Sequence, residues 1–226
     1  LLCLPAMAQM NIGIKAGANL SNVQQNYKDN ALEWNTRMLF AYHAGVIMDY
    51  SLSDVLSLQP GLFYIRRGYS IDWEKELQGE RDFEGFDRYY FDYVDLPVHV
   101  AYKFGNVQLF AGPYISAGIG GRNRMDFSYA DAVLGDVNIK DKTKLKPFMK
   151  KVKDSDLDSD ESPFYGLDYG FNVGLGYQRG SFLIHTGYSN GLGNLIADLE
   201  GESNFRKDNK VRNRGINLSL TYFLGE

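Results

Sequence analysis

The sequence predicts an all-β fold, an eight-stranded antiparallel up-and-down barrel that crosses a membrane, and three observations support this prediction. Apolar and polar residues alternate with period two in eight separate runs. The connections between these runs are alternately short and long, and the polar face of the runs is rich in small residues. The chain also contains 16 Tyr, 14 Phe and 24 Gly, a composition that favours strands with many small positions.

The alternating runs place apolar side chains on one face of each predicted strand. In the first run, Ile12 and Ile14 alternate with Gly13 and Lys15. Only every second residue of a membrane barrel must be apolar, so the mean hydropathy of −0.32 is compatible with a membrane location. The eight runs cover residues 12–20, 40–50, 56–64, 94–104, 107–119, 167–177, 182–188 and 216–224.

Connection lengths predict the orientation of the barrel. Short connections lie at 51–55, 105–106 and 179–180, and they correspond to periplasmic turns. The longer connections correspond to outer loops, and with an even number of strands both termini lie on the periplasmic side. The long connections span residues 22–39, 66–90, 122–164 and 191–212.

A soluble barrel is the alternative, because such barrels also alternate. The outer wall of a soluble barrel would carry many Lys and Glu residues, whereas the polar face here is mostly Gly, Asn and Ser with isolated charges. Small polar residues suit a crowded interior. Aromatic residues near the strand ends match the girdles of membrane barrels. The membrane barrel is therefore favoured.

The first eight residues are interpreted as a residual signal peptide, and residues 9–226 as the barrel domain. Leu1–Ala8 is apolar and ends in Ala-x-Ala, so cleavage is expected before Gln9. The alternatives are an ordinary apolar strand, or a lipoprotein acylated at Cys3.

Cys3 is the single cysteine, which excludes a disulfide framework, and the net charge of −4 argues against nucleic-acid binding.

Six short segments resemble the PorT-like outer-membrane β-barrel family, also labelled porin-like and common in Bacteroidetes. The segments occur in the order found in the family and extend over nearly the whole chain. The resemblance implies an outer-membrane barrel and leaves open a role in assembling a secretion machine. The segments are Ile14–Ser21, Leu56–Tyr64, Val94–Val98, Phe110–Tyr114, Phe171–Gly176 and Ile216–Leu220.

Titratable residues on the polar face predict an interior hydrogen-bond network rather than a catalytic site. No candidate nucleophile and general base are spaced in the sequence so that they would meet beside the lipid. No catalytic, cofactor-binding or metal-binding residues are therefore assigned. All three histidines of the chain, His43, His99 and His185, fall on this face. The groups expected to satisfy one another are Lys15, Asp49, Asp95, His99, Lys103 and Asp168.

The third long connection is unusually charged. Seven lysines between Lys140 and Lys153 precede the acidic run Asp154–Glu161. We expect a solvated, mobile loop whose charges neutralise one another. The alternatives are Ca²⁺ binding by the acidic run, although an EF-hand's Gly and final Glu are absent, and attraction of the lysines to lipopolysaccharide phosphates.

Two basic pairs and an aromatic segment flank the outer rim in this prediction. Arg66-Arg67 and Arg122-x-Arg124 follow upward strands, which places them near anionic head groups or makes them solubilising rim residues. The aromatic residues between 73 and 91 are interpreted as strand extensions above the membrane, with an exposed contact surface as the alternative.

The sequence thus predicts a non-enzymatic barrel of a Gram-negative outer membrane, with a structural or interaction role. Its expected partners are outer-membrane lipids including lipopolysaccharide, and proteins that contact the long outer loops. The alternatives are a lipid-modifying enzyme, a small channel and a secretion-machinery component. A wide channel is disfavoured, because side chains fill the interior of an eight-stranded barrel.

Overall fold

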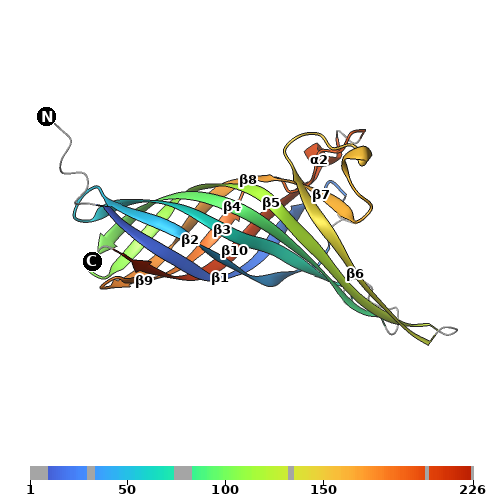
Figure 1. Cartoon of the computed structure of the whole chain (residues 1–226), viewed down its shortest axis with the longest axis horizontal. Helices are drawn as coiled ribbons and strands as arrows, with labels where there is room; N and C mark the ends of the chain where they lie inside the picture. Colours follow the sequence, from blue (N-terminus) through green and yellow to red (C-terminus); the bar gives the residue numbers. More distant parts are fainter. Residues whose placement is uncertain (1–9, 30–33, 74–82, 132–134, 202–203, 225–226) are drawn as a thin grey trace.

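Most of the described chain is β-structure, and it forms a long tube with an arm at one end (Figure 1). In the computed structural model the described residues are 10–29, 34–73, 83–131, 135–201 and 204–224. The predicted signal peptide, residues 1–8 with Cys3, and the expected cleavage point at Gln9 lie outside these ranges.

A closed ring of eight antiparallel strands makes the barrel wall in the described residues. The first and last ring strands pair with each other, so the ring has no free edge. The prediction of an all-β, eight-stranded up-and-down barrel is confirmed. The ring strands are β1 (Met10–Asn26), β2 (Thr36–Ser51), β3 (Leu56–Asp72), β4 (Phe83–Phe104), β5 (Val107–Asp131), β8 (Leu167–Arg179), β9 (Phe182–Gly191) and β10 (Lys210–Phe223).

The tight turns lie at the end of the tube where β1 begins and β10 ends (Figure 1). Residues 52–55, 105–106 and 180–181 connect β2 to β3, β4 to β5 and β8 to β9. Gly105 has φ 59° and Gly180 has φ 56°, a left-handed conformation that glycine adopts without steric cost. The predicted short connections are therefore confirmed.

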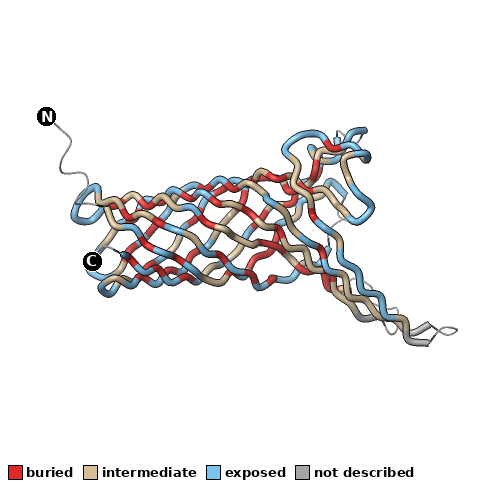
Figure 2. The backbone as a smooth tube through the Cα atoms, viewed as in Figure 1, coloured by how far each residue is buried: buried red, intermediate tan, exposed pale blue. Residues whose placement is uncertain are grey.

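Buried and exposed residues alternate along the strands of the barrel, as the alternating colours show (Figure 2). On β8, Val173 points outward and is 47% exposed, whereas its neighbour Asn172 is buried. The same alternation recurs on every ring strand and gives the wall an apolar outer surface. No helix in the described residues is long and apolar enough to cross a membrane.

The charged connection between β5 and β8 is not the irregular loop that the sequence predicts. Strand β6 (Gly135–Phe148) pairs antiparallel with the outer part of β5, and β7 (Glu161–Tyr165) pairs parallel with β6. Strand β8 pairs with β5 only as far as Ala117, and β6 pairs with β5 from Arg122 onward. The expectation of a mobile loop is wrong, because β5 continues past the ring and offers a new edge to β6.

The projecting part of β4, β5 and β6, residues 83–91, 122–131 and 135–145, is called the arm (Figure 1). The aromatic residues Phe86 and Tyr89–Phe91 lie within β4. Their interpretation as a strand extension is therefore confirmed. A register shift opposite Asp92 and Tyr93 places Ile119 in a β-bulge, so that both Ile119 and Arg122 are exposed on the outer face.

Candidate functional site

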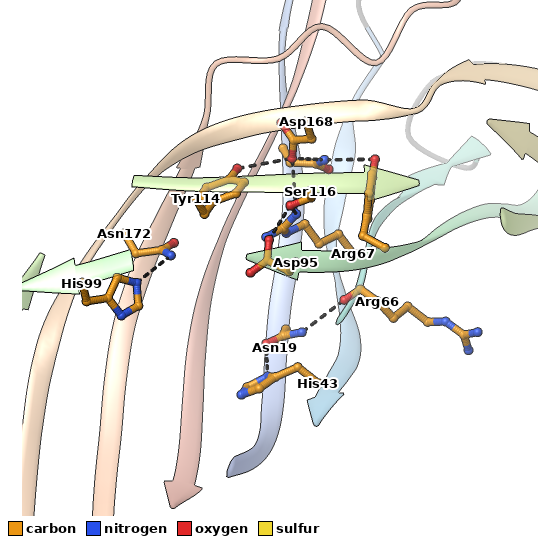
Figure 3. A network of polar contacts seen from close by, with 12 residues as sticks. Asn19, His43, Arg66, Arg67, Asp95, His99, Tyr114, Ser116, Asp168 and Asn172 are labelled. Atoms are coloured by element: carbon orange, nitrogen blue, oxygen red, sulfur yellow. Dashed lines mark hydrogen bonds and ion pairs between the residues drawn. The ribbon is translucent and has the colours of Figure 1, made fainter. Parts of the chain in front are cut away.

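Arg67 on β3 is the centre of a buried polar network inside the barrel (Figure 3). Its Nη2 lies 2.9 Å from Asp95 Oδ1, and its Nη1 lies 3.4 Å from Asp168 Oδ2. Nη1 also donates to Ser116 Oγ over 2.9 Å, and Ser116 in turn donates to Asp95. Tyr114 donates to Asp168 over 3.2 Å. One guanidinium thus ties together side chains from strands β3, β4, β5 and β8.

The placement of Arg67 corrects the prediction that Arg66 and Arg67 both lie at the rim. Figure 3 shows Arg67 directed into the network and Arg66 directed away from it. Arg66 binds Asp92 through two hydrogen bonds of 2.6 and 2.9 Å. Phe63, Ile65 and Arg67 share the inward face of β3, so extending the alternation three residues beyond Tyr64 would have found the inward arginine.

A second chain of polar contacts lies nearer the turn end of the barrel. Lys103 pairs with Asp49 at 2.5 Å, and Gln59 donates to the other carboxylate oxygen of Asp49 over 3.0 Å. Gln59 also donates to Gln108, whose amide nitrogen lies 2.9 Å from His185 Nε2. The expected participation of Asp49 and Lys103 in an interior network is confirmed, with two glutamines that the sequence did not single out.

The middle of the barrel holds a small cavity with Lys15 in its wall. The cavity has a volume of about 60 Å³, which suits a few water molecules. The ammonium of Lys15 lies 5.6 Å from the centre of the Phe63 ring. Among the described residues Lys15 makes no ion pair, so its expected pairing with the interior carboxylates is wrong. His99, also expected in that network, bonds Asn172 at 3.0 Å instead.

His43 sits between Asn19 and Ser219 in an arrangement that resembles a hydrolytic triad. Its Nδ1 is 2.7 Å from Asn19 Oδ1, and its Nε2 is 2.9 Å from Ser219 Oγ. The sequence spacing gave no sign of this pairing, since Ser219 and His43 lie on different strands. Ser219 is 3% exposed and points into the barrel, away from the lipid. The small cavity beside this group leaves no room for an acyl chain.

An apolar cluster, called the outer cap, covers the end of the polar interior opposite the turns. Leu145 of β6, Phe164 of β7 and Leu195 pack on Phe91 and Tyr93 of β4. The Phe164 ring centre lies 5.0 Å from that of Phe91 and 6.1 Å from that of Tyr93. Segments that the sequence assigned to outer loops therefore supply part of the barrel's core.

The comparison with protein families agrees with this architecture. The family model described as "Outer membrane protein beta-barrel domain" matches residues 7–197. This chain belongs to that family. The protein is therefore a β-barrel of the Gram-negative outer membrane. A search of curated proteins finds no match.

Solved structures similar to this outer-membrane barrel share little of its sequence. Ail of Yersinia pestis is 13% identical with a TM-score of 0.42, covering 96% of this chain and 99% of Ail. Neisserial surface protein A is 12% identical with a TM-score of 0.42, and 93% and 96% of the two chains are covered. The protease OmpT of Escherichia coli is 9% identical with a TM-score of 0.32, and 95% and 97% are covered.

Two lysines of the charged segment of this outer-membrane barrel pair with carboxylates of its acidic run. Lys144 pairs with Asp160 at 3.0 Å, and Lys146 pairs with Glu161 at 2.8 Å. These hydrogen bonds hold the pKa values of both carboxyl groups below their usual range. The expected mutual neutralisation is thus present for these two pairs, whereas Lys140 pairs with Asp126 and Lys153 pairs with Glu200, both outside the segment. Among the described residues no group of three or more His, Cys, Asp or Glu is placed to hold a metal ion.

Proposed function

We propose that this protein is a non-enzymatic outer-membrane barrel whose role is interaction outside the membrane, through the arm. The observation that carries the proposal is the contrast between the barrel and the arm. Inside the barrel, charged groups are paired across strands around Arg67 and Asp49, and the outer cap lies over them. The arm is an ordered sheet that projects beyond the ring (Figure 1).

The alternative of a small channel is disfavoured by the filled interior. A side-chain network occupies the barrel at the level of Arg67, and a cavity of about 60 Å³ remains in the middle. Eight-stranded barrels have an interior that side chains fill. We expect the purified protein to give no stepwise conductance in planar bilayers, and stable single-channel steps would contradict the proposal.

The alternative of a lipid-modifying enzyme has one specific observation in its favour, the Asn19–His43–Ser219 group. A hydrolase acting on lipids needs its nucleophile beside the lipid. Ser219 faces the interior instead, and its partner His43 is buried. We therefore assign this group to the interior network and not to catalysis.

A more specific part of the proposal is membership of the PorT-like type. It is supported by the six segments that resemble that family, which fall on β1, β3, β4, β5, β8 and β10. A role in assembling a secretion machine would be one form of the proposed interaction, in which the arm contacts another protein of the outer membrane.

The experiment that tests the interaction role is crosslinking in intact cells, followed by mass spectrometry. The variants are a replacement of residues 126–141 by a short Gly/Ser linker and, as a control, Gly substitutions in the turn 52–55. We expect a specific crosslinked partner with the intact protein and the turn variant, and its loss with the arm variant. Equal recovery from all three proteins would contradict the assignment of the role to the arm.

A further inference from the structure

A row of three cations crosses the outward face of the arm. Arg88 of β4 lies directly opposite Arg124 of β5, and Arg124 lies directly opposite Lys142 of β6. Directly paired residues in an antiparallel sheet point to the same face, where like charges repel each other. Neighbouring strands lie about 5 Å apart, so the three cationic side chains leave the sheet from adjacent positions. A row of this kind lowers stability unless an anion compensates it.

The carboxylates near this row are engaged elsewhere. Asp126 pairs with Lys140 at 3.0 Å, and Asp72 pairs with Arg37. In the part of the chain that the structure describes, none of the three cations in the row makes an ion pair. The guanidinium of Arg88 lies instead over the Phe86 ring, 3.8 Å from its centre. Within the described residues, the arm therefore presents a local positive charge that no ion pair neutralises.

A groove of about 850 Å³ lies beside this row, between the outer end of β2 and the arm. Its lining combines apolar side chains with the cations Arg37 and Arg88 and with the carboxylates Asp72 and Asp126, each of which is in an ion pair. Met38 and Phe40 of β2 are 56% and 66% exposed, and they follow the outward face of β2 towards Tyr42 and Val46 of the lipid-facing wall. Arg88 and Tyr90 of the arm form the opposite side. The groove thus joins the apolar outer wall of the barrel to the cationic face of the arm.

A further arginine, Arg122, extends the positive face towards the membrane, and Arg66 beside it is paired with Asp92. The Arg66 and Arg122 guanidinium carbons lie 5.6 and 5.4 Å from the centre of the Tyr90 ring. Tyr90 precedes Asp92 and Val94 on the outward face of β4, where the lipid-facing residues begin. Cations on this side of the apolar band lie at the level of lipid head groups.

We propose that this groove and the cation row beside it bind the phosphorylated head group of an outer-leaflet lipid, with Arg88, Arg124 and Lys142 on the phosphate and Met38 and Phe40 on the adjoining acyl chains. A phosphate supplies the missing negative charge, and arginine matches its geometry with two parallel hydrogen bonds. The apolar pair explains why the ligand is a lipid and not a free ion. This inference does not depend on whether the arm also contacts a protein.

The test measures lipid bound to the full chain in detergent by native mass spectrometry. The probes are lipid A carrying two phosphates, the same lipid with its phosphates removed, and inorganic phosphate. The variant is R88Q combined with R124Q, and the control is K150Q combined with K151Q, two exposed lysines outside the groove. Heat-modifiable gel mobility verifies that each variant is folded.

We expect the phosphorylated lipid to bind the wild type and the lysine control equally, and the arginine variant at least about tenfold more weakly. Binding should weaken as ionic strength rises, because exposed charges are screened. A variant in which Met38 and Phe40 are both changed to Gln should bind the phosphorylated lipid more weakly than the wild type. Its binding of inorganic phosphate should be the same as that of the wild type.

Three outcomes would overturn the proposal. Equal lipid binding by the arginine variant and the wild type would show that the cation row does not bind the lipid phosphate. Equal binding of the dephosphorylated lipid would show that apolar contact alone holds it. Displacement of the lipid by inorganic phosphate at equal concentration would identify a site for a free anion.

Discussion

Arg67 on β3 and Asp168 on β8 meet in the interior of the barrel, with Nη1 3.4 Å from Oδ2, although their strands are not neighbours in the ring. The same guanidinium pairs with Asp95, and the side chains of all three residues are at most 6% exposed. A buried charge that loses its partner is strongly unfavourable. Because β3 and β8 are not neighbours, this contact joins distant parts of the barrel wall.

Replacing Arg67 by Met should lower the free energy of unfolding by about 3–5 kcal/mol, because Asp95 and Asp168 remain buried without their cation. The measurement is urea-induced unfolding in lipid vesicles. The control is Arg37→Met, whose ion pair with Asp72 is more than half exposed on the arginine side. That change should cost about 0–1 kcal/mol. Similar losses in both variants would contradict a central role for Arg67.

The two faces of β8 predict losses of stability that differ in size and cause at neighbouring positions. Val173→Arg places a charge against the lipid, and it should cost about 2–4 kcal/mol if the position is near the midplane. Asn172→Ala should cost about 1 kcal/mol through the lost hydrogen bond to His99. Unfolding in vesicles measures both. If Val173→Arg cost no more stability than Asn172→Ala, the assignment of the faces would be wrong.

The barrel itself could be predicted from sequence because a membrane imposes alternation on the wall. Every second residue from Ile12 to Leu20, for example, points to lipid, and the pattern marks the strand and its faces together. The limits of the strands were underestimated, since beyond the lipid both faces of a strand can be polar. The bulge at Ile119 also reverses the alternation in β5, so Arg122 could not be placed by counting onward from Leu109.

The candidate site was only partly predictable, and β6 shows why. Lys140, Lys142, Lys144 and Lys146 alternate with Asp141, Thr143 and Leu145, a period-two pattern obscured by high charge. Composition favoured a disordered loop, but pairing with β5 supplies backbone hydrogen bonds that composition does not report. The contacts of Arg67 with Asp168 and of His43 with Ser219 join residues distant in sequence, and no local pattern encodes them.

Ser219 should not act as a nucleophile, although His43 lies 2.9 Å from its hydroxyl. We expect no labelling of Ser219 by a fluorophosphonate probe, and no ester hydrolysis above background in mixed micelles. Ser219→Ala should instead cost about 1 kcal/mol of stability, because His43 loses a hydrogen-bond partner. Covalent labelling at Ser219 that is lost in the Ser219→Ala variant would contradict this prediction.

The attachment of β6 to the acidic segment should loosen in acid. The pKa of Glu161 is lowered by its hydrogen bond with Lys146, and that of Asp160 by its hydrogen bond with Lys144. A carboxyl group whose pKa is lower in the folded state stabilises that state above its unfolded pKa, and the effect is lost as pH falls through the folded pKa. The ordinary values are 3.8 for Asp and 4.5 for Glu.

Hydrogen exchange followed by mass spectrometry measures this loosening. Between pH 6 and pH 3, residues 142–148 should lose protection once the change in chemical exchange rate is corrected. Peptides from β8 and β9, which lie outside this charged segment, provide the internal control. Unchanged protection of β6 at pH 3 would show that backbone pairing alone holds the segment.

Two replacements of different length should separate the arm from the outer cap. Replacing residues 126–141 by a short Gly/Ser linker removes only the projecting tip, and unfolding should change by less than about 1 kcal/mol, since closure entropy depends weakly on loop length. Replacing residues 123–162 also removes Leu145 from the cap and Asn123, which donates to Asp87. Loss of a buried leucine side chain typically costs about 2–5 kcal/mol.

The ring pairs without either segment, so both variants should remain heat-modifiable barrels, and only the longer replacement should unfold at markedly lower urea concentration. Equal stability of the two variants would show that Leu145 contributes nothing to the cap, whereas failure of the shorter variant to fold would show that the arm is needed to assemble the ring.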